Sequence, residues 1–275
     1  MTLVSGKTVA IATSGSGQAI QFPVRLAAGQ RLGSFSDPQS GLQATFSPSG
    51  DQGTVIIPLT IQGLPARMRI EVGAGSVQGE LVTTPVRRVL LEAGPVAIAA
   101  GPEPEAALEV VATLRQVPEA VAIEVRPVSV GGQIEAAGRS AAERAGLAIE
   151  AMAYSVEIRP GGGTTVSSGT LVFTVTRDWL AQWPENSLRV LRIDGQGRAS
   201  FLSVDQSGAT GADKVRLQAE SPEGFSTFAV VAVKAKVKVE AGGGSGMIIA
   251  VAGVAVAVVV VGGFFLLRRG KRPAA

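Results

Sequence analysis

The sequence contains no cysteine and no histidine in its 275 residues. These absences exclude disulfides, thiolate nucleophiles, imidazole bases and the usual ligands of zinc, copper and haem. Aromatic residues are also scarce, at 4% of the chain, and charged residues make up 17%. A core must therefore be built mainly from Val, Ala, Leu and Ile, which favours packed strands over an aromatic binding groove. We expect no enzymatic activity, no cofactor and no bound metal.

Basic charge is concentrated at the C-terminal end of the chain. The net charge is +3 and the pI is about 9.6. Four of the 25 basic residues lie at the end of the chain: Arg268, Arg269, Lys271 and Arg272. The rest of the chain has 21 basic and 22 acidic residues, so its net charge is close to zero. No cluster of Arg and Lys interleaved with aromatics occurs in it, and we expect no nucleic-acid partner.

A long apolar segment runs from Met247 to Leu267, 21 residues without a charged side chain. At a rise of about 1.5 Å per residue, a helix of this length spans about 30 Å, the hydrocarbon thickness of a bilayer. Only a helix satisfies its own backbone groups there, so the many valines do not argue for a strand. The segment 247–267 is therefore predicted to be a single transmembrane helix.

The basic run that follows this segment predicts how the helix is oriented across the membrane. By the positive-inside rule, residues 268–275 form a basic cytoplasmic tail and the bulk of the chain is extracytoplasmic. A Lys- and Gly-rich linker, 234–246, separates the helix from the body. Gly253 and Ala257 form a small-xxx-small pair of the kind that packs membrane helices together. We expect a single-pass protein of the cell membrane.

The start of the sequence conflicts with this orientation, because the first 18 residues contain no apolar stretch typical of a signal peptide. Two explanations stay open. Either the chain lacks its true N-terminus, or the helix is a tail anchor that leaves the body in the cytoplasm. The basic flank favours the first explanation.

The body is predicted to be mainly β, with two antiparallel β-sandwich-like domains. Short runs of alternating apolar and polar residues are separated by turns rich in Gly, Ser, Pro and Asp. Three prolines in 94–105 mark a boundary between an N-terminal β domain, 1–100, and a membrane-proximal β domain, 106–233. The predicted strands are 8–12, 19–26, 54–61, 68–72, 107–114, 120–130, 153–159, 170–176, 188–193, 199–204, 214–219 and 227–233. The one predicted helix of the body is 136–150, and the glycines after Asp194 predict a hairpin.

Landmarks in the second domain follow a recognisable order. A strand at 172–175 runs shortly into Asp178-Trp-Leu180, and the segment 220–230 closes with GFSTFAV. This order resembles the PGF-pre-PGF domain of archaeal-type cell-surface proteins, over residues about 105–232. The resemblance implies a membrane-proximal β domain on an exported, envelope-associated protein, and it transfers no catalytic residue. The chain departs from the family in having no Pro-Gly-Phe tripeptide.

Three groups of residues are candidate sites of chemistry. Four aspartates on or beside predicted loops are candidate calcium ligands, but they match no EF-hand pattern, and we interpret them as solvated turn residues. Four glutamates are candidates for a glycosidase pair, and we interpret them as exposed strand positions. The glycine-rich stretches 15–17 and 161–163 lack a phosphate loop's Lys-Ser/Thr and are interpreted as turns. The acidic candidates are Asp178, Asp194, Asp205 and Asp213, and Glu109, Glu124, Glu157 and Glu220.

These features predict a membrane-anchored cell-surface protein with a structural, display or adhesive role in the cell envelope. Its expected partners are the lipid bilayer and envelope proteins or polysaccharide, bound by loops of the N-terminal domain. The alternative is an accessory or sensor subunit of a membrane complex that associates through its transmembrane helix. An envelope hydrolase is a third hypothesis, which requires two carboxylates about 5 to 10 Å apart in a deep cleft.

Overall fold

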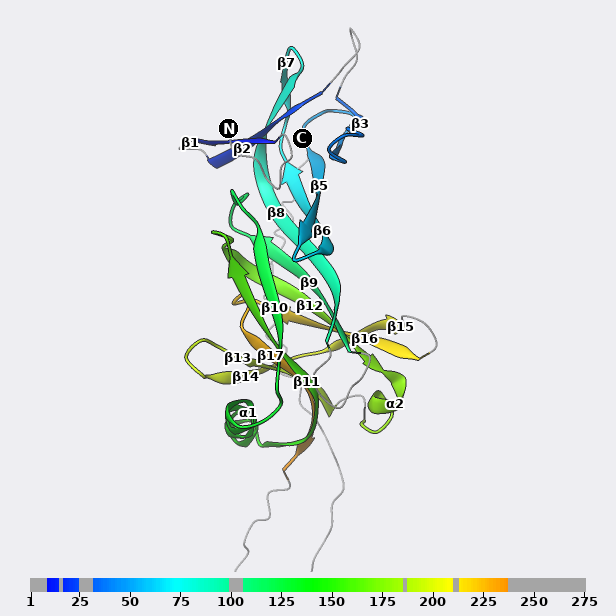
Figure 1. The fold of residues 1–275 in the computed structure, drawn as a ribbon, viewed down its shortest axis with the longest axis vertical. Helices are drawn as coiled ribbons and strands as arrows, with labels where there is room; N and C mark the ends of the chain where they lie inside the picture. The colour runs from blue at the N-terminus through cyan, green and yellow to red at the C-terminus, as the bar shows by residue number, and fades with distance from the viewer. Residues whose placement is uncertain are drawn as a thin grey trace, which may run out of the picture. The chain divides into compact units, whose positions relative to one another are not determined.

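Antiparallel strands form most of the structure, which is a computed structural model (Figure 1). It describes residues 9–14, 17–24, 32–98, 106–184, 187–209 and 213–236. All of these belong to one unit, Met1–Lys236. The mainly β prediction is confirmed. Of the predicted linker 234–246, Lys234 and Ala235 belong to strand β17. Residues 237–246, the apolar segment 247–267 and the tail 268–275 lie outside the described residues.

Strands far outnumber helices along the described chain. The strands are β1 (Ala10–Ser14), β2 (Gly17–Pro23), β3 (Ser34–Ser36), β4 (Gln43–Phe46), β5 (Gly53–Ile61), β6 (Leu64–Val72), β7 (Ser76–Gln78), β8 (Leu81–Ala97), β9 (Ala107–Leu114), β10 (Ala122–Val128), β11 (Leu147–Gly161), β12 (Val166–Thr176), β13 (Leu188–Ile193), β14 (Ala199–Leu202), β15 (Asp205–Ala209), β16 (Lys214–Ser221) and β17 (Thr227–Ala235). The helices are α1 (Gln133–Arg144) and α2 (Arg177–Leu180).

A 12-stranded sheet contains strands from both halves of the body. Nine of them follow the order β15-β16-β12-β9-β8-β6-β5-β4-β3, while β2 and β7 pair with β8 and β1 pairs with β2. The long strand β8 joins its parts. The first half of β8 pairs with β2 and β7, and its second half pairs with β6 and β9. Along much of these strands, buried residues alternate with less buried ones, so one face of the sheet lines the core.

The second sheet has five strands in the order β10-β11-β17-β13-β14 and packs against the first. Tyr154 of β11 and Phe173 of β12 meet between the two sheets, with ring centroids 6.0 Å apart. The buried Tyr154 hydroxyl donates to the carbonyl oxygens of Ala107 and Thr174 on the large sheet, at 3.2 and 3.3 Å. A buried hydroxyl needs such a partner. The sandwich-like packing is therefore fixed by a polar contact as well as by apolar burial.

Helix α1 covers the opposite face of the five-stranded sheet. It approaches closely at Gly138, where an added Cβ would lie 2.9 Å from Ile149 and 3.0 Å from Leu191. The helix begins at Gln133 and ends at Arg144, so the prediction of a helix continuing to residue 150 is wrong at its C-terminal end. Gly146, with a φ of +67°, ends it, and the following residues form the first part of β11.

The predicted boundary at 94–105 begins inside β8 and ends before β9, and these two strands pair in one sheet. Residues 89–97 of β8 pair with β9, with an irregularity between Ala93 and Val96. The residues of the two predicted β domains also share one apolar core. A side chain adds to this link: the Gln18 amide donates to the Val117 carbonyl oxygen at 3.1 Å and accepts from the Val117 N–H at 2.6 Å. Residues 99–105 lie outside the described residues.

We expect Gln18→Ala to lower the free energy of unfolding by about 1 to 3 kcal/mol, because it leaves the buried Val117 N–H without its partner. Urea denaturation monitored by circular dichroism measures the change. The control is Gln78→Ala at an exposed position of β7, which should stay within about 0.5 kcal/mol of the parent. Equal effects of the two substitutions would show that the Gln18 contact contributes nothing.

Candidate functional site

The predicted membrane-anchor residues all lie outside the described residues. The prediction of a transmembrane helix with a basic cytoplasmic flank therefore rests on the sequence. Within the described ranges, neither helix has the length and apolarity to cross a bilayer. The anchor residues concerned are Met247, Gly253, Ala257, Leu267, Arg268, Arg269, Lys271 and Arg272.

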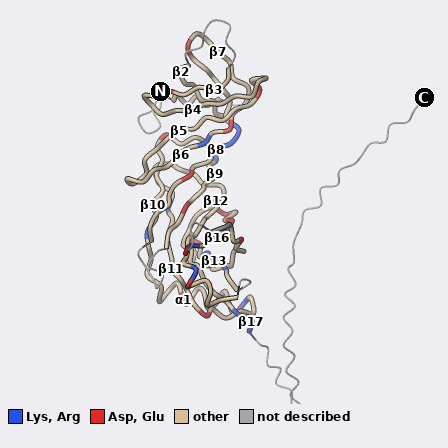
Figure 2. The backbone as a smooth tube through the Cα atoms, turned by 90° about the vertical axis from the view of Figure 1, so that its right-hand side faces the viewer, with Lys and Arg blue, Asp and Glu red and all other residues tan. Residues whose placement is uncertain are grey.

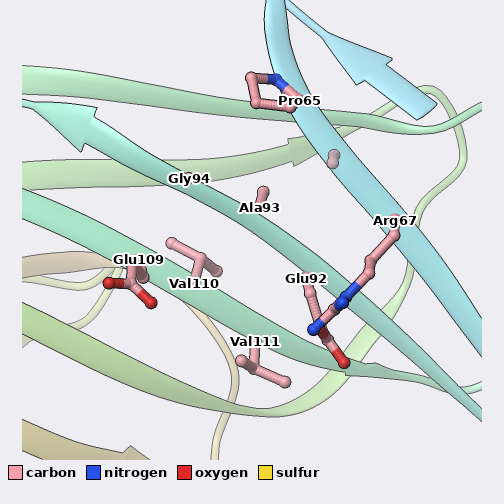
Figure 3. Close-up of a pocket in the computed structure, with 9 residues that line it drawn as sticks. Pro65, Arg67, Glu92, Ala93, Gly94, Glu109, Val110 and Val111 are labelled. Atoms are coloured by element: carbon pink, nitrogen blue, oxygen red, sulfur yellow. The ribbon is translucent and has the colours of Figure 1, made fainter. Parts of the chain in front are cut away.

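Within the body, a hollow of about 280 Å³ opens on the large sheet where β6, β8 and β9 run side by side (Figure 3). It lies at the irregularity of β8. Gly94 has a φ of +108°, and an added Cβ there would lie 2.7 Å from the carbonyl oxygen of Leu108. Only glycine lets β8 approach β9 this closely. The lining residues are Pro65, Ala66, Arg67, Glu92, Ala93, Gly94, Glu109, Val110 and Val111.

Two carboxylates line this hollow, and each is held by arginine. Glu92 pairs with the Nε atom of Arg67, and the Nε atom of Arg69 lies 3.4 Å from its other oxygen. Glu109 accepts from Nη2 of Arg216 at 2.7 Å, a contact that reaches from β9 to β16 across the intervening strand β12. Figure 3 shows Glu92 beside Arg67 and Glu109 away from both. Each carboxylate of the hollow is thus paired with an arginine from another strand of the large sheet.

The four glutamates considered for a glycosidase are divided between the two sheets. Glu109 and Glu220 lie on β9 and β16 of the large sheet, and Glu124 and Glu157 lie on β10 and β11 of the smaller one. Each has a partner: Arg216, Thr170, Arg126 and Arg159, respectively. Glu92, which shares the hollow with Glu109, is not among the sequence candidates. Only the strand register brings these two together.

The candidate calcium aspartates have structural contacts of their own. Asp194 closes the turn between β13 and β14, where its Oδ1 accepts the N–H groups of Gln196 and Arg198, each at 2.9 Å. Its Oδ2 accepts from Nε of Arg198 at 2.7 Å. The carbonyl oxygen of Asp213 accepts from the N–H of Arg177. Within the described ranges, no three His, Cys, Asp or Glu residues converge as a metal site.

The hydrogen bond from the Arg198 side chain, followed by those from backbone N–H groups, lowers the pKa of Asp194 below its usual 3.8. A carboxyl group with a lowered pKa in the folded state stabilises the fold above its unfolded pKa, and this contribution is lost as the pH falls through the folded pKa. The parent should therefore be more stable than Asp194→Asn at neutral pH, with a difference that shrinks once the pH drops below 3.8.

Urea denaturation of the parent and of Asp194→Asn between pH 7 and pH 2 measures this difference. Gln196→Ala is the control, since it keeps the backbone N–H that Asp194 accepts and adds no titratable group. A difference between the parent and Asp194→Asn that stays constant down to the lowest pH would mean that the Asp194 carboxylate does not stabilise the hairpin.

Two further hollows were not predicted from the sequence. One, of about 650 Å³, lies between the start of α1, β11 and the turn after β13, with Gln133, Arg159 and Asp194 in its wall. The other, of about 620 Å³, has Pro23, Phe35 and Glu80 in its wall, beside the β7–β8 turn. The side chains of Val77 and Leu81 flank that turn and are 41% and 48% exposed. The sequence feature that could have indicated this hollow is the pair of apolar residues on either side of Gly79-Glu80.

The landmarks of the PGF-pre-PGF resemblance occupy core and turn positions. Trp179 in α2 is buried and lies beside Trp183, with ring centroids 6.2 Å apart. Phe228 is fully buried in β17, and Gly224, with a φ of +76°, makes the turn before it. Comparison with known proteins found no matching family model, no matching curated protein and no matching solved structure. The resemblance stays a prediction.

Proposed function

We propose that this chain is a membrane-anchored protein of the cell surface whose β body has a structural, display or adhesive role in the cell envelope. The observation that carries the proposal is the uncharged segment 247–267 with four basic residues directly behind it. A segment of this length and flank partitions into a bilayer with its basic end in the cytoplasm. The body then lies outside the membrane.

The end of the described body supports this arrangement. Strand β17 ends at Ala235, and the ten residues 237–246 separate Lys236 from the apolar segment. Even fully extended, ten residues reach about 35 Å, at up to about 3.5 Å each. The C-terminal end of β17 is therefore held near the membrane surface. The PGF-pre-PGF resemblance agrees with a membrane-proximal β domain.

The chemistry of the body favours display over catalysis. The carboxylates considered for hydrolysis are paired with arginine or threonine side chains. Figure 2 shows acidic and basic residues along the same described strands, and this mixture of charges argues against a nucleic-acid partner. In this proposal, envelope proteins or polysaccharide contact the loops around the β7–β8 turn, where Val77 and Leu81 are exposed.

Fractionation of cells that make the full chain tests the proposal. We expect the chain to sediment with membranes, to stay there through washes with high salt and with alkaline carbonate, and to dissolve in detergent. Washing at high pH removes proteins held by charge alone, so it separates an inserted helix from a basic tail bound to lipid headgroups. Recovery of the chain in the carbonate supernatant would contradict the proposal.

The spacing of Gly253 and Ala257 supports a second candidate, an accessory or sensor subunit that binds another membrane protein through the helix. The substitution Gly253→Leu distinguishes the accessory subunit from the display protein. It keeps the segment apolar but fills the space that a close helix contact needs. Loss of a detergent-stable complex in native electrophoresis would favour the second candidate, and an unchanged migration would favour display.

A further inference from the structure

The strand that precedes the linker is the central strand of the five-stranded sheet. Its nine residues pair antiparallel with β11 at nine positions and with β13 at six. Its two faces are both covered. Phe228, Val230 and Ala232 face the core between the sheets, and Ala229 and Val231 belong to the cluster under α1. A strand that is buried on both faces usually has a continuous run of apolar residues in its sequence, and β17 has such a run from Phe228 to Val233.

The last residues of β17 are also held at the point where the chain leaves the body. Ala235 pairs with Leu147, and the N–H of Lys236 donates to the carbonyl oxygen of Gly146 at 2.9 Å. Two ion pairs add to this contact. Nζ of Lys234 lies 2.6 Å from Glu150, and Nζ of Lys236 lies 3.8 Å from Glu143. Pairing therefore continues to the last described residue.

We propose that β17 transmits and resists mechanical tension between the anchor and the body. This inference rests on the proposed function, because a surface protein that binds a ligand is pulled through its linker. Tension applied at residue 237 pulls on the C-terminal end of β17. It loads the hydrogen bonds that pair β17 with β11 and with β13. Many hydrogen bonds then share the force, and extraction also opens both apolar clusters to water.

An edge strand would respond differently to the same pull. Strand β14 pairs on one side only, at four positions, and its residues are less buried than those of β17. Its bonds would break one after another at low force. The protein therefore has its linker on a strand that is paired along both sides, at nine and six positions, and not on an edge strand that is paired at four.

Single-molecule pulling tests the proposal on the full chain in detergent micelles. Because the sequence has no cysteine, handles attach only at the thiols that are engineered. The first arrangement places handles at Gln78→Cys and after Ala275. Gln78 is exposed and leads into β8, which is paired on both sides, so this end of the chain is also held firmly. The comparison arrangement joins Gln78→Cys with Ser203→Cys, an exposed position directly after β14.

Forced unfolding reports the unfolding barrier along the pulled direction. At equal loading rate, we expect the C-terminal handle to give a rupture force severalfold above that of the Ser203→Cys handle, in one event. An equal or lower force, or an early weak step that frees only residues 227–236, would overturn the inference. Either result leaves the proposed function standing, because carbonate fractionation of the parent chain decides that separately.

Discussion

Replacing Val256 and Val258 together with arginine should release the chain from membranes. The two residues flank Ala257, the midpoint of the apolar segment 247–267. Each arginine at the centre of a membrane helix costs about 2.5 to 3.5 kcal/mol of insertion free energy. The double substitution therefore makes the free energy of insertion less favourable by about 5 to 7 kcal/mol, which is enough to keep a single helix out of the bilayer. Alkaline carbonate fractionation measures the result.

The control for this prediction is the double substitution Val256→Leu and Val258→Leu, which keeps the segment apolar and should leave the chain in the membrane pellet. Urea denaturation of the released arginine variant should match that of the parent in detergent, because the segment lies beyond the last residue of β17. An arginine variant that still resists carbonate extraction would mean that something other than the apolar segment holds the chain.

Phe173→Ala should lower the free energy of unfolding of the body by about 3 to 5 kcal/mol, the usual cost of removing a fully buried aromatic ring. Phe173 lies between the two sheets, beside Tyr154, and the cavity would open in the shared core. Because the strands on both sides of 94–105 share that core, we expect one cooperative transition, shifted as a whole to lower urea.

Leu81→Ala is the matched control for Phe173→Ala, since it also removes a large apolar side chain but from a position 48% exposed. Its effect should stay within about 0.5 kcal/mol. If Phe173→Ala shifted only part of the unfolding signal, the body would unfold as two independent units. If its shift equalled that of Leu81→Ala, the ring would not be part of a packed core.

The sequence predicted the elements whose signals are local. Strand β13 has the predicted bounds, and β12 and β17 contain the predicted segments. The hairpin at Asp194 was also predicted and is present, with β13 paired to β14. In each case a short run rich in apolar residues has a glycine or an aspartate near one end: Gly169 before segment 170–176, Asp194 after β13, and Gly224 shortly before β17.

Strand β8 shows where local signals fail. The sequence does not predict it, because Pro85, Arg87, Arg88 and Pro95 interrupt the alternation expected of a strand. Proline is tolerated there for positional reasons. Pro85 lies where the pairing of β8 changes from β2 to β6, and Pro95 lies in the irregularity of the β8–β9 pairing. The prolines that favour a domain boundary in the sequence therefore begin inside a paired strand.

The contacts of the hollow could not be predicted for a related reason. Arg67 and Glu92 are separated by 25 residues, and Glu109 and Arg216 by 107. Their meeting depends on the strand register, which one sequence does not specify. The Gln18 contact with Val117, 99 residues away, is of the same kind. The anchor, by contrast, is predicted from 21 consecutive residues, because bilayer insertion depends on local apolarity alone.

Thiol labelling in intact cells tests the proposed orientation of the chain across the membrane. Two full-length variants of this cysteine-free chain are needed, Gln78→Cys in the body and Ala274→Cys in the tail. With a maleimide that does not cross membranes, the thiol of Gln78→Cys should react in intact cells, and that of Ala274→Cys only after permeabilisation. The reverse pattern would place the body in the cytoplasm and contradict the proposed function.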